Sequence, residues 1–258
     1  MTVTRIAELP HDVRRNLFHG TERIELAAAF RWTARLNMHE GVANHFSLAV
    51  SDDGTQFLIN PNQVHFSLVR ASDLLLLDAN DSGTMDRPDA PDPTAWALHS
   101  ALHRLCPHAR CAMHVHSVHA TVLAVLADPI LPPIDQNTAQ FFNRIAVDAN
   151  YGGIALGEEA ERVCKLLADP AKKVLVMGNH GVMVVGANVA DTFNRLYYFE
   201  RSAETYIKAL WTGQKLRRLS DEVAEMTARE WEKYPESARK FMDAILQLLD
   251  RDGEDYRH

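Results

Sequence analysis

The chain has 258 residues, of which 47% are hydrophobic, so it is long enough to bury a sizeable core as one large domain or as a domain with an appendage. Its formal charge of -7 argues against nucleic acid as the main partner, because nucleic-acid-binding proteins usually carry a basic face. Three cysteines without Cys-x-x-Cys spacing argue against a disulfide framework, and the lack of a signal core or of an apolar run of about 20 residues predicts a soluble cytoplasmic protein with no membrane partner.

The first half of the chain predicts one packing helix and a group of short strands. Residues 22–37 repeat apolar side chains at a period of about 3.6, which indicates an amphipathic helix. Three strand-like runs follow at residues 46–50, 56–60 and 74–78, and turn-forming residues separate them. A proline-rich loop then leads into a helix that runs to about Leu105, with Thr94 as the expected N-cap.

The second half mixes strands and helices before a helical C-terminus. A strand is expected over residues 110–116, helices over 118–127 and 157–167, and two more strands on either side of His180. A long helix should run from Val189 to about Leu210, and two amphipathic helices should follow it. The chain is thus expected to divide into an N-terminal extension (1–21), an α/β domain (22–211) and C-terminal amphipathic helices (212–258).

Three histidines carry the strongest chemical signal. His114 and His116 flank one valine in a predicted strand, where alternate side chains share a face. His180 stands before Gly181, and a tight glycine turn can aim its imidazole out of the sheet edge. Three imidazoles from two strand ends predict a divalent metal site with open coordination positions, typical of catalytic zinc or iron. The alternative is a chance His-x-His pair in a chain with 13 histidines.

Six motifs, taken in order along the chain, resemble the class II aldolase and adducin head family. They are Asn44-His-Phe-Ser47, Phe57-Leu-Ile-Asn-Pro61, Ala71-Ser-Asp-Leu-Leu75, His99, His114-x-His116 and Asn179-His-Gly181. The resemblance covers roughly Ile24 to Leu210 and implies an α/β/α sandwich around a mostly antiparallel sheet. It further implies a homotetramer with active sites between subunits, a small-molecule substrate, and zinc, or else iron or manganese, on His114, His116 and His180.

The sequence departs from the sugar-phosphate aldolases of that family in two places. Their acid and base residue lies four positions before the counterpart of His99, and that position is Ala95 here. Their phosphate-binding loop corresponds to Asn60-Pro-Asn-Gln63, and Ala49 stands where their strand carries an arginine. A substrate phosphate would meet no cation there, so a non-phosphorylated substrate is expected.

A metal on three histidines can stabilise the negative charge of an enolate, which serves aldol cleavage and decarboxylation alike. The expected activity is therefore that of a metal-dependent lyase on a small hydroxy- or oxo-acid. The candidate proton carriers are His119, Asp92, Asp135, Tyr151, Tyr198 and Glu200. The candidate substrate contacts are His45, Ser47, Asn62 and Thr94. Structural roles stay open for these residues, such as a cap for Asp135 or a brace of the long helix for Tyr198 and Glu200.

Two other functions stay open. A non-catalytic binding module like the adducin head would explain Ala95, whereas retention of three ligand histidines favours an enzyme. An iron-dependent oxygenase on the same fold is the second alternative. His99 and His103 form an i, i+4 pair, but a separate metal site there is disfavoured because His103 is expected to be solvated.

Overall fold

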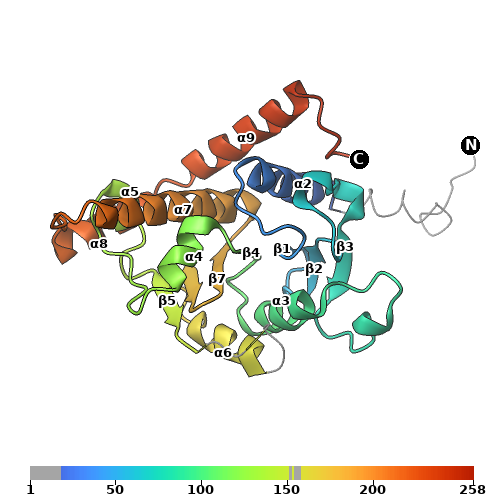
Figure 1. Ribbon diagram of the computed structural model, residues 1–258. Helices are drawn as coiled ribbons and strands as arrows, with labels where there is room; N and C mark the ends of the chain where they lie inside the picture. Colours follow the sequence, from blue (N-terminus) through green and yellow to red (C-terminus); the bar gives the residue numbers. More distant parts are fainter. Residues whose placement is uncertain (1–18, 151–152, 154–157) are drawn as a thin grey trace, which may run out of the picture.

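The computed structural model describes residues 19–150, 153 and 158–258, and its centre is one sheet of seven strands (Figure 1). The strands are β1 (His45–Ala49), β2 (Gln56–Ile59), β3 (Leu75–Asp78), β4 (Cys111–Val115), β5 (Ile145–Asp148), β6 (Val174–Met177) and β7 (Gly181–Gly186). Their order is β3-β2-β1-β4-β7-β6-β5, and every neighbouring pair is antiparallel except β5 with β6. The expectation of a mostly antiparallel sheet is confirmed.

Helices cover both faces of this sheet (Figure 1). They are α2 (Gly20–Arg35), α3 (Pro93–Leu105), α4 (Val118–Ala124), α5 (Gln136–Ala139), α6 (Glu158–Leu166), α7 (Val189–Trp211), α8 (Asp221–Glu232) and α9 (Glu236–Arg251), with the short 3-10 helices η2 (Phe66–Leu68), η3 (Ala71–Asp73) and η4 (Thr84–Asp86). One face packs on α2, α4, α7 and α9 through residues such as Phe46 and Val184, and the other packs on α3 and α6 through Leu175 and Met183. This arrangement is the α/β/α sandwich that the sequence predicts.

Successive side chains of β1 point to opposite faces of the sheet, and this places polar residues in the interior. Phe46 and Leu48 belong to the core beneath α2 and α7. His45 and Ser47 therefore project to the other face, on which α3 packs. Because β1 pairs with β4, His45 lies directly opposite His114. The register of two neighbouring strands thus brings the two histidines together.

The N-cap of α3 differs from the sequence expectation. Asp92, not Thr94, caps this helix, because its carboxylate accepts hydrogen bonds from the backbone N–H groups of Thr94 and Ala95. Pro93 then occupies the first helical position, where a missing N–H group costs no hydrogen bond. Asp92 is therefore engaged as a cap.

The C-terminal helix α9 packs on its own domain, against α2 and α7 (Figure 1). Met242, Ile245 and Leu249 form its buried stripe. The tail after α9 returns to η3, where the backbone N–H of Ala71 donates to the carbonyl of Tyr256 at 2.9 Å. Among the described residues, no helix combines the length and apolar character needed to cross a membrane.

Candidate metal centre

His114 is a buried residue of β4 whose ring orientation is set by the neighbouring strand. Its Nδ1 lies 3.0 Å from the carbonyl oxygen of Val182, at the start of β7. A carbonyl oxygen only accepts hydrogen bonds, so Nδ1 carries the proton and Nε2 keeps its lone pair. This is the usual way in which a protein prepares a histidine to bind a metal through Nε2.

His180 lies in the turn that connects β6 to β7. Its backbone N–H donates to the carbonyl of Met177 at 3.0 Å, and Asn179 before it adopts the left-handed conformation with φ of 57°. A Cβ atom at Gly181 would lie 2.6 Å from the carbonyl oxygen of Val115 and 2.8 Å from Cδ2 of His116. Glycine is therefore required for the turn to approach the end of β4 this closely.

The three imidazoles meet at one point. Their ring centroids are separated by 4.9 Å for His114 and His116 and by 4.8 Å for each pair that includes His180. One ligand nitrogen from each ring lies within 4.8 Å of the other two, and the Nε2 atoms of His114 and His116 are 3.0 Å apart. Two nitrogens that bind one zinc at about 2.0–2.1 Å lie about 3 Å apart, so the geometry fits a shared divalent ion.

The charge state of the cluster also suits a metal. Burial, and next the neighbouring His180, lower the pKa of His116 from 6.5 to about 4. Burial likewise lowers the pKa of His180 and holds that of His114 well below its ordinary value. All three imidazoles are therefore neutral near pH 7, and their lone pairs are available without prior loss of a proton.

Glu200 of α7 holds the segment that follows His116. Its carboxylate accepts hydrogen bonds from the Ser117 hydroxyl at 2.6 Å and from the backbone N–H groups of His119 and Ala120 at 3.0 Å. Nδ1 of His119 lies 2.9 Å from the same carboxylate. The first N–H groups of α4 have no partner within their own helix, and a carboxylate accepts hydrogen bonds from such groups. Glu200, a residue of α7, therefore acts as the cap of α4. This is a structural role, as the bracing alternative expects, and it joins α7 to the segment that directly follows His116.

A chain of four buried polar side chains leads away from His114, and we call it the buried histidine chain. The His45 ring stands 4.8 Å from the His114 ring, and its Nδ1 lies 2.7 Å from Nε2 of His99 on α3. Nδ1 of His99 lies 2.5 Å from the Ser47 hydroxyl, which in turn lies 2.7 Å from Nε2 of His103. The chain thus joins β1 to α3 beside the metal centre.

Two members of this chain lie where the sequence analysis did not expect them. His103 is only 2% exposed rather than solvated, because the i, i+4 spacing puts it on the same inward face of α3 as His99. Ser47 is fully buried, so its hydroxyl contacts these two imidazoles and not the open side of the cluster. The signal for this arrangement was present in the sequence as polar residues two apart in a strand and four apart in a helix.

The remaining acidic and hydroxyl candidates have structural partners. Thr94 donates its hydroxyl hydrogen bond to Asp92 at the start of α3. Asp135 caps α5 by accepting a hydrogen bond of 2.7 Å from the backbone N–H of Thr138, as its capping alternative predicts. Ala95, at the position of the missing family acid, is buried in an apolar cluster.

Three further candidates remain. Asn62 is exposed in the turn that follows β2. Tyr198 contacts Trp231 of α8 with ring centroids 5.7 Å apart, so it links α7 to the C-terminal helices. Tyr151 lies outside the described residues.

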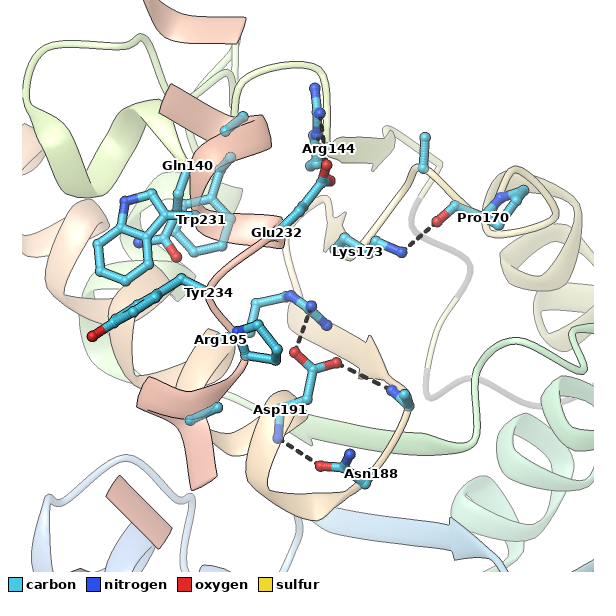
Figure 2. Close-up of a pocket in the computed structure, with 16 residues that line it drawn as sticks. Gln140, Arg144, Pro170, Lys173, Asn188, Asp191, Arg195, Trp231, Glu232 and Tyr234 are labelled. Atoms are coloured by element: carbon cyan, nitrogen blue, oxygen red, sulfur yellow. Dashed lines mark hydrogen bonds and ion pairs between the residues drawn. The ribbon is translucent and has the colours of Figure 1, made fainter. Parts of the chain in front are cut away.

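A large cavity lies at the opposite end of β7 from His180. It has a volume of about 640 Å³ and opens between α7 and the C-terminal helices, with Trp231 and Tyr234 on one side (Figure 2). Its basic side chains already have partners: Arg195 pairs with Asp191 at 2.8 Å, and Lys173 donates to the carbonyl of Pro170. These two basic side chains are therefore already engaged, and the histidines remain the candidate reactive centre.

Comparisons with known proteins find relatives that match most of this chain. Residues 24–207 match the family described as the class II aldolase and adducin N-terminal domain. A putative aldolase class 2 protein, PA3430 of Pseudomonas aeruginosa, is 29% identical over 225 residues, which are 86% of this chain and 85% of the relative. The decarboxylase NovR of Streptomyces niveus is 25% identical over 206 residues, covering 79% of this chain and 75% of that protein. The crystal structure of an aldolase II superfamily protein from Pseudomonas syringae has a TM-score of 0.82 at 28% identity and covers 93% of this chain and 96% of its own.

Proposed function

Because this chain belongs to the class II aldolase and adducin N-terminal domain family, we propose that it is a metal-dependent lyase that cleaves a small, non-phosphorylated hydroxy- or oxo-acid. The reaction class is carbon–carbon bond cleavage, either aldol cleavage or decarboxylation. The observation that carries the proposal is the convergence of His114, His116 and His180, with ligand atoms within 4.8 Å of one another.

A divalent ion on these ligands would supply a Lewis acid that stabilises negative charge on a substrate oxygen. Zinc is the proposed ion, because imidazole suits zinc and no carboxylate belongs to the ligand cluster; iron and manganese are the alternatives. The three histidines are neutral, and one ring nitrogen of each faces the same point. The carbonyl oxygen of Val182 fixes the orientation of the His114 ring through its Nδ1. These residues would orient the reacting acid by its oxygens.

The proton carrier differs from the acid of sugar-phosphate aldolases, since Ala95 replaces it. His119 is one candidate, because Glu200 engages its Nδ1 and leaves Nε2 for proton transfer. His45 is the second candidate for contact with substrate, because its ring lies 4.8 Å from that of His114. Ala49, at the position of the phosphate-binding arginine, supports a non-phosphorylated substrate.

Decarboxylation has separate support. NovR is described as a decarboxylase and resembles this chain over most of both sequences. Loss of carbon dioxide requires an electron sink before it requires a proton, so a site without the aldolase acid can still support it. Decarboxylation of an oxo-acid is therefore the first activity to assay.

The second candidate function is a non-catalytic module like the adducin head, which the absence of an acid at Ala95 favours. Metal content separates the two, because a binding module has no chemical need for a stoichiometric ion.

We further propose a homotetramer in the reducing cytoplasm, consistent with three free buried cysteines. Light scattering after size-exclusion chromatography tests the assembly.

The decisive experiment is elemental mass spectrometry of protein purified without a metal-chelating tag. The wild-type chain and a His258→Ala control, altered only at the exposed C-terminus, should each carry close to one ion per chain. The His114→Ala/His116→Ala variant should carry none and should not release carbon dioxide or aldol products from a panel of oxo- and hydroxy-acids. A wild-type protein that stays metal-free after incubation with zinc, iron or manganese would overturn the lyase and favour the binding module.

A further inference from the structure

We propose that the buried histidine chain holds His45 as a neutral imidazole whose Nε2–H group donates a hydrogen bond to an oxygen bound at the metal centre. His99, Ser47 and His103 are then positioning residues that act through His45. The proposal rests on the proposed function for the nature of that oxygen, whereas the hydrogen-bond pattern itself comes from the contacts within the chain.

The first step concerns which nitrogen of His45 is available. Its Nδ1 is engaged by His99 at 2.7 Å. Its Nε2 makes no hydrogen bond within the part of the chain that the structure describes. The ring is 4% exposed and neighbours His114, but His45 is not part of the three-histidine ligand cluster. Nε2 is therefore left for a molecule that binds beside the cluster.

The second step concerns charge. The chain consists of three imidazoles and one hydroxyl, and no carboxylate makes a hydrogen bond to any of them among the described residues. Even one imidazolium in this interior would be a buried charge without a carboxylate to compensate it, which is costly. Each imidazole is therefore neutral and offers one donor and one acceptor.

Neutral rings allow three complete hydrogen-bond patterns, because the Ser47 hydroxyl can donate one hydrogen bond and accept two. In the first, His103 Nε2–H donates to Ser47, Ser47 donates to His99 Nδ1, and His99 Nε2–H donates to His45 Nδ1, so the proton of His45 is on Nε2. In the second, every bond runs in the opposite direction, and Nε2 of His45 carries no proton. In the third, Ser47 accepts from both His99 Nδ1–H and His103 Nε2–H, and Nε2 of His45 again carries no proton. Any other arrangement would leave two donors or two acceptors facing each other, which costs a buried hydrogen bond.

The metal centre selects the first pattern. Three neutral imidazoles leave the positive charge of a divalent ion uncompensated, so the substrate oxygens that bind there carry negative charge. A negatively charged oxygen accepts hydrogen bonds, and a neutral histidine placed beside it contributes as a donor. The chain thus supplies an electrophilic contact in a site where Ala95 removes the usual acid.

The test uses zinc-loaded protein labelled with [15N]histidine, because ring nitrogen chemical shifts distinguish the two neutral tautomers. In the wild type, His45, His99 and His103 should all carry the proton on Nε2. Ser47→Ala removes the link between His99 and His103, so His103 should become a tautomer mixture, whereas His45 and His99 stay joined to each other and should keep the proton on Nε2. Ser202→Ala, which removes another buried hydroxyl outside the chain, is the matched control and should keep the wild-type pattern.

Activity provides the second readout. Ser47→Ala should lower kcat about tenfold while KM and zinc content stay unchanged, as expected for loss of a group that orients another. His45→Phe, which removes the donor itself, should lower kcat by about 10²–10³-fold and retain zinc. Ser202→Ala should leave both parameters unchanged.

The two proposals fail in different ways. A proton on Nδ1 of His45, a His103 tautomer that does not respond to Ser47→Ala, or loss of zinc in His45→Phe would overturn the inference even if the protein is an active lyase. A wild-type chain that binds no zinc would overturn the proposed function, and the tautomers of His99 and His103 would still test the hydrogen-bond pattern.

Discussion

The Ser117 hydroxyl donates a hydrogen bond of 2.6 Å to the Glu200 carboxylate, which ties α7 to the residue directly after His116. Glu200 is 8% exposed and accepts two backbone hydrogen bonds from the first turn of α4 as well. One buried carboxylate therefore fixes both the start of a helix and the position of a candidate metal ligand.

The first prediction concerns Glu200→Gln. The amide keeps the size of the side chain but replaces one acceptor oxygen with a donor, so one of the N–H groups of α4 loses its partner. We expect the free energy of unfolding to fall by about 1–3 kcal/mol. Zinc affinity, measured by competition with a chelator, should fall by about tenfold or more.

The matched control is Glu204→Gln, one turn later on α7. Glu204 pairs with Arg201 and Lys208 at the surface, so its loss should change stability by less than about 1 kcal/mol. Equal zinc affinity in the Glu200 and Glu204 variants would contradict the positioning of His116 by Glu200.

The second prediction concerns Gly181→Ala. The new methyl group would lie 2.6 Å from the backbone oxygen of Val115, and backbone cannot move aside as a flexible side chain can. The pairing of β4 with β7 should loosen beside the three histidines, with a lower melting temperature and loss of most bound metal. Gly20→Ala is the control, since a Cβ there meets no atom within 4 Å. Full metal occupancy in Gly181→Ala would show that the turn tolerates displacement.

The third prediction is a pH dependence that arises from His103. Burial lowers the pKa of this imidazole from 6.5 to about 3. As the pH falls from 6.5 toward 3, the unfolded chain takes up a proton that the folded protein excludes, so this contribution to stability is present above pH 6.5 and is lost on acidification. Each pH unit in that window costs about 1.4 kcal/mol for one such group.

Urea unfolding of His103→Gln at several pH values checks this expectation. The variant should show an unfolding free energy that depends less steeply on pH between 6.5 and 3, by about one proton. Above pH 7 the difference between variant and wild type should be constant, because it then reports only packing and hydrogen bonding. Parallel pH profiles over the whole range would indicate that His103 is accessible to protons in the folded state.

The fourth prediction concerns the packing of α9. Ile245 is fully buried in the main core, which includes residues of α2 and α7. Ile245→Ala should lower the free energy of unfolding by about 2–5 kcal/mol through lost burial and the cavity left behind. Met226→Ala on α8, where the side chain is 53% exposed, is the control and should have a small effect. Equal stability of the two variants would show that α9 adds little to the fold.

Local patterns in the sequence were sufficient to identify most elements. The long apolar period of α7 and the strand-like run of β4 predict these elements, because helix and strand periods depend only on neighbouring residues. The pairing of His114 with His116 was predictable for the same reason, since alternate residues of a strand share a face in any fold. The glycine turn at Gly181 indicated His180 as the third candidate ligand, and the family motifs added the layered architecture.

Only the tertiary structure decided which distant residues support those ligands. Ser117 and Glu200 are 83 positions apart, and Ser47 and His103 are 56 apart, so no local period relates them. Their contacts follow from the order of strands in the sheet, which places β1 beside β4 and brings α3 over β1. The sequence by itself thus determined the three histidines that are the candidate ligands and the alanine at position 95. The fold determined the buried histidine chain and the Glu200 cap, because hydrogen bonds between separate elements exist only after the elements have packed.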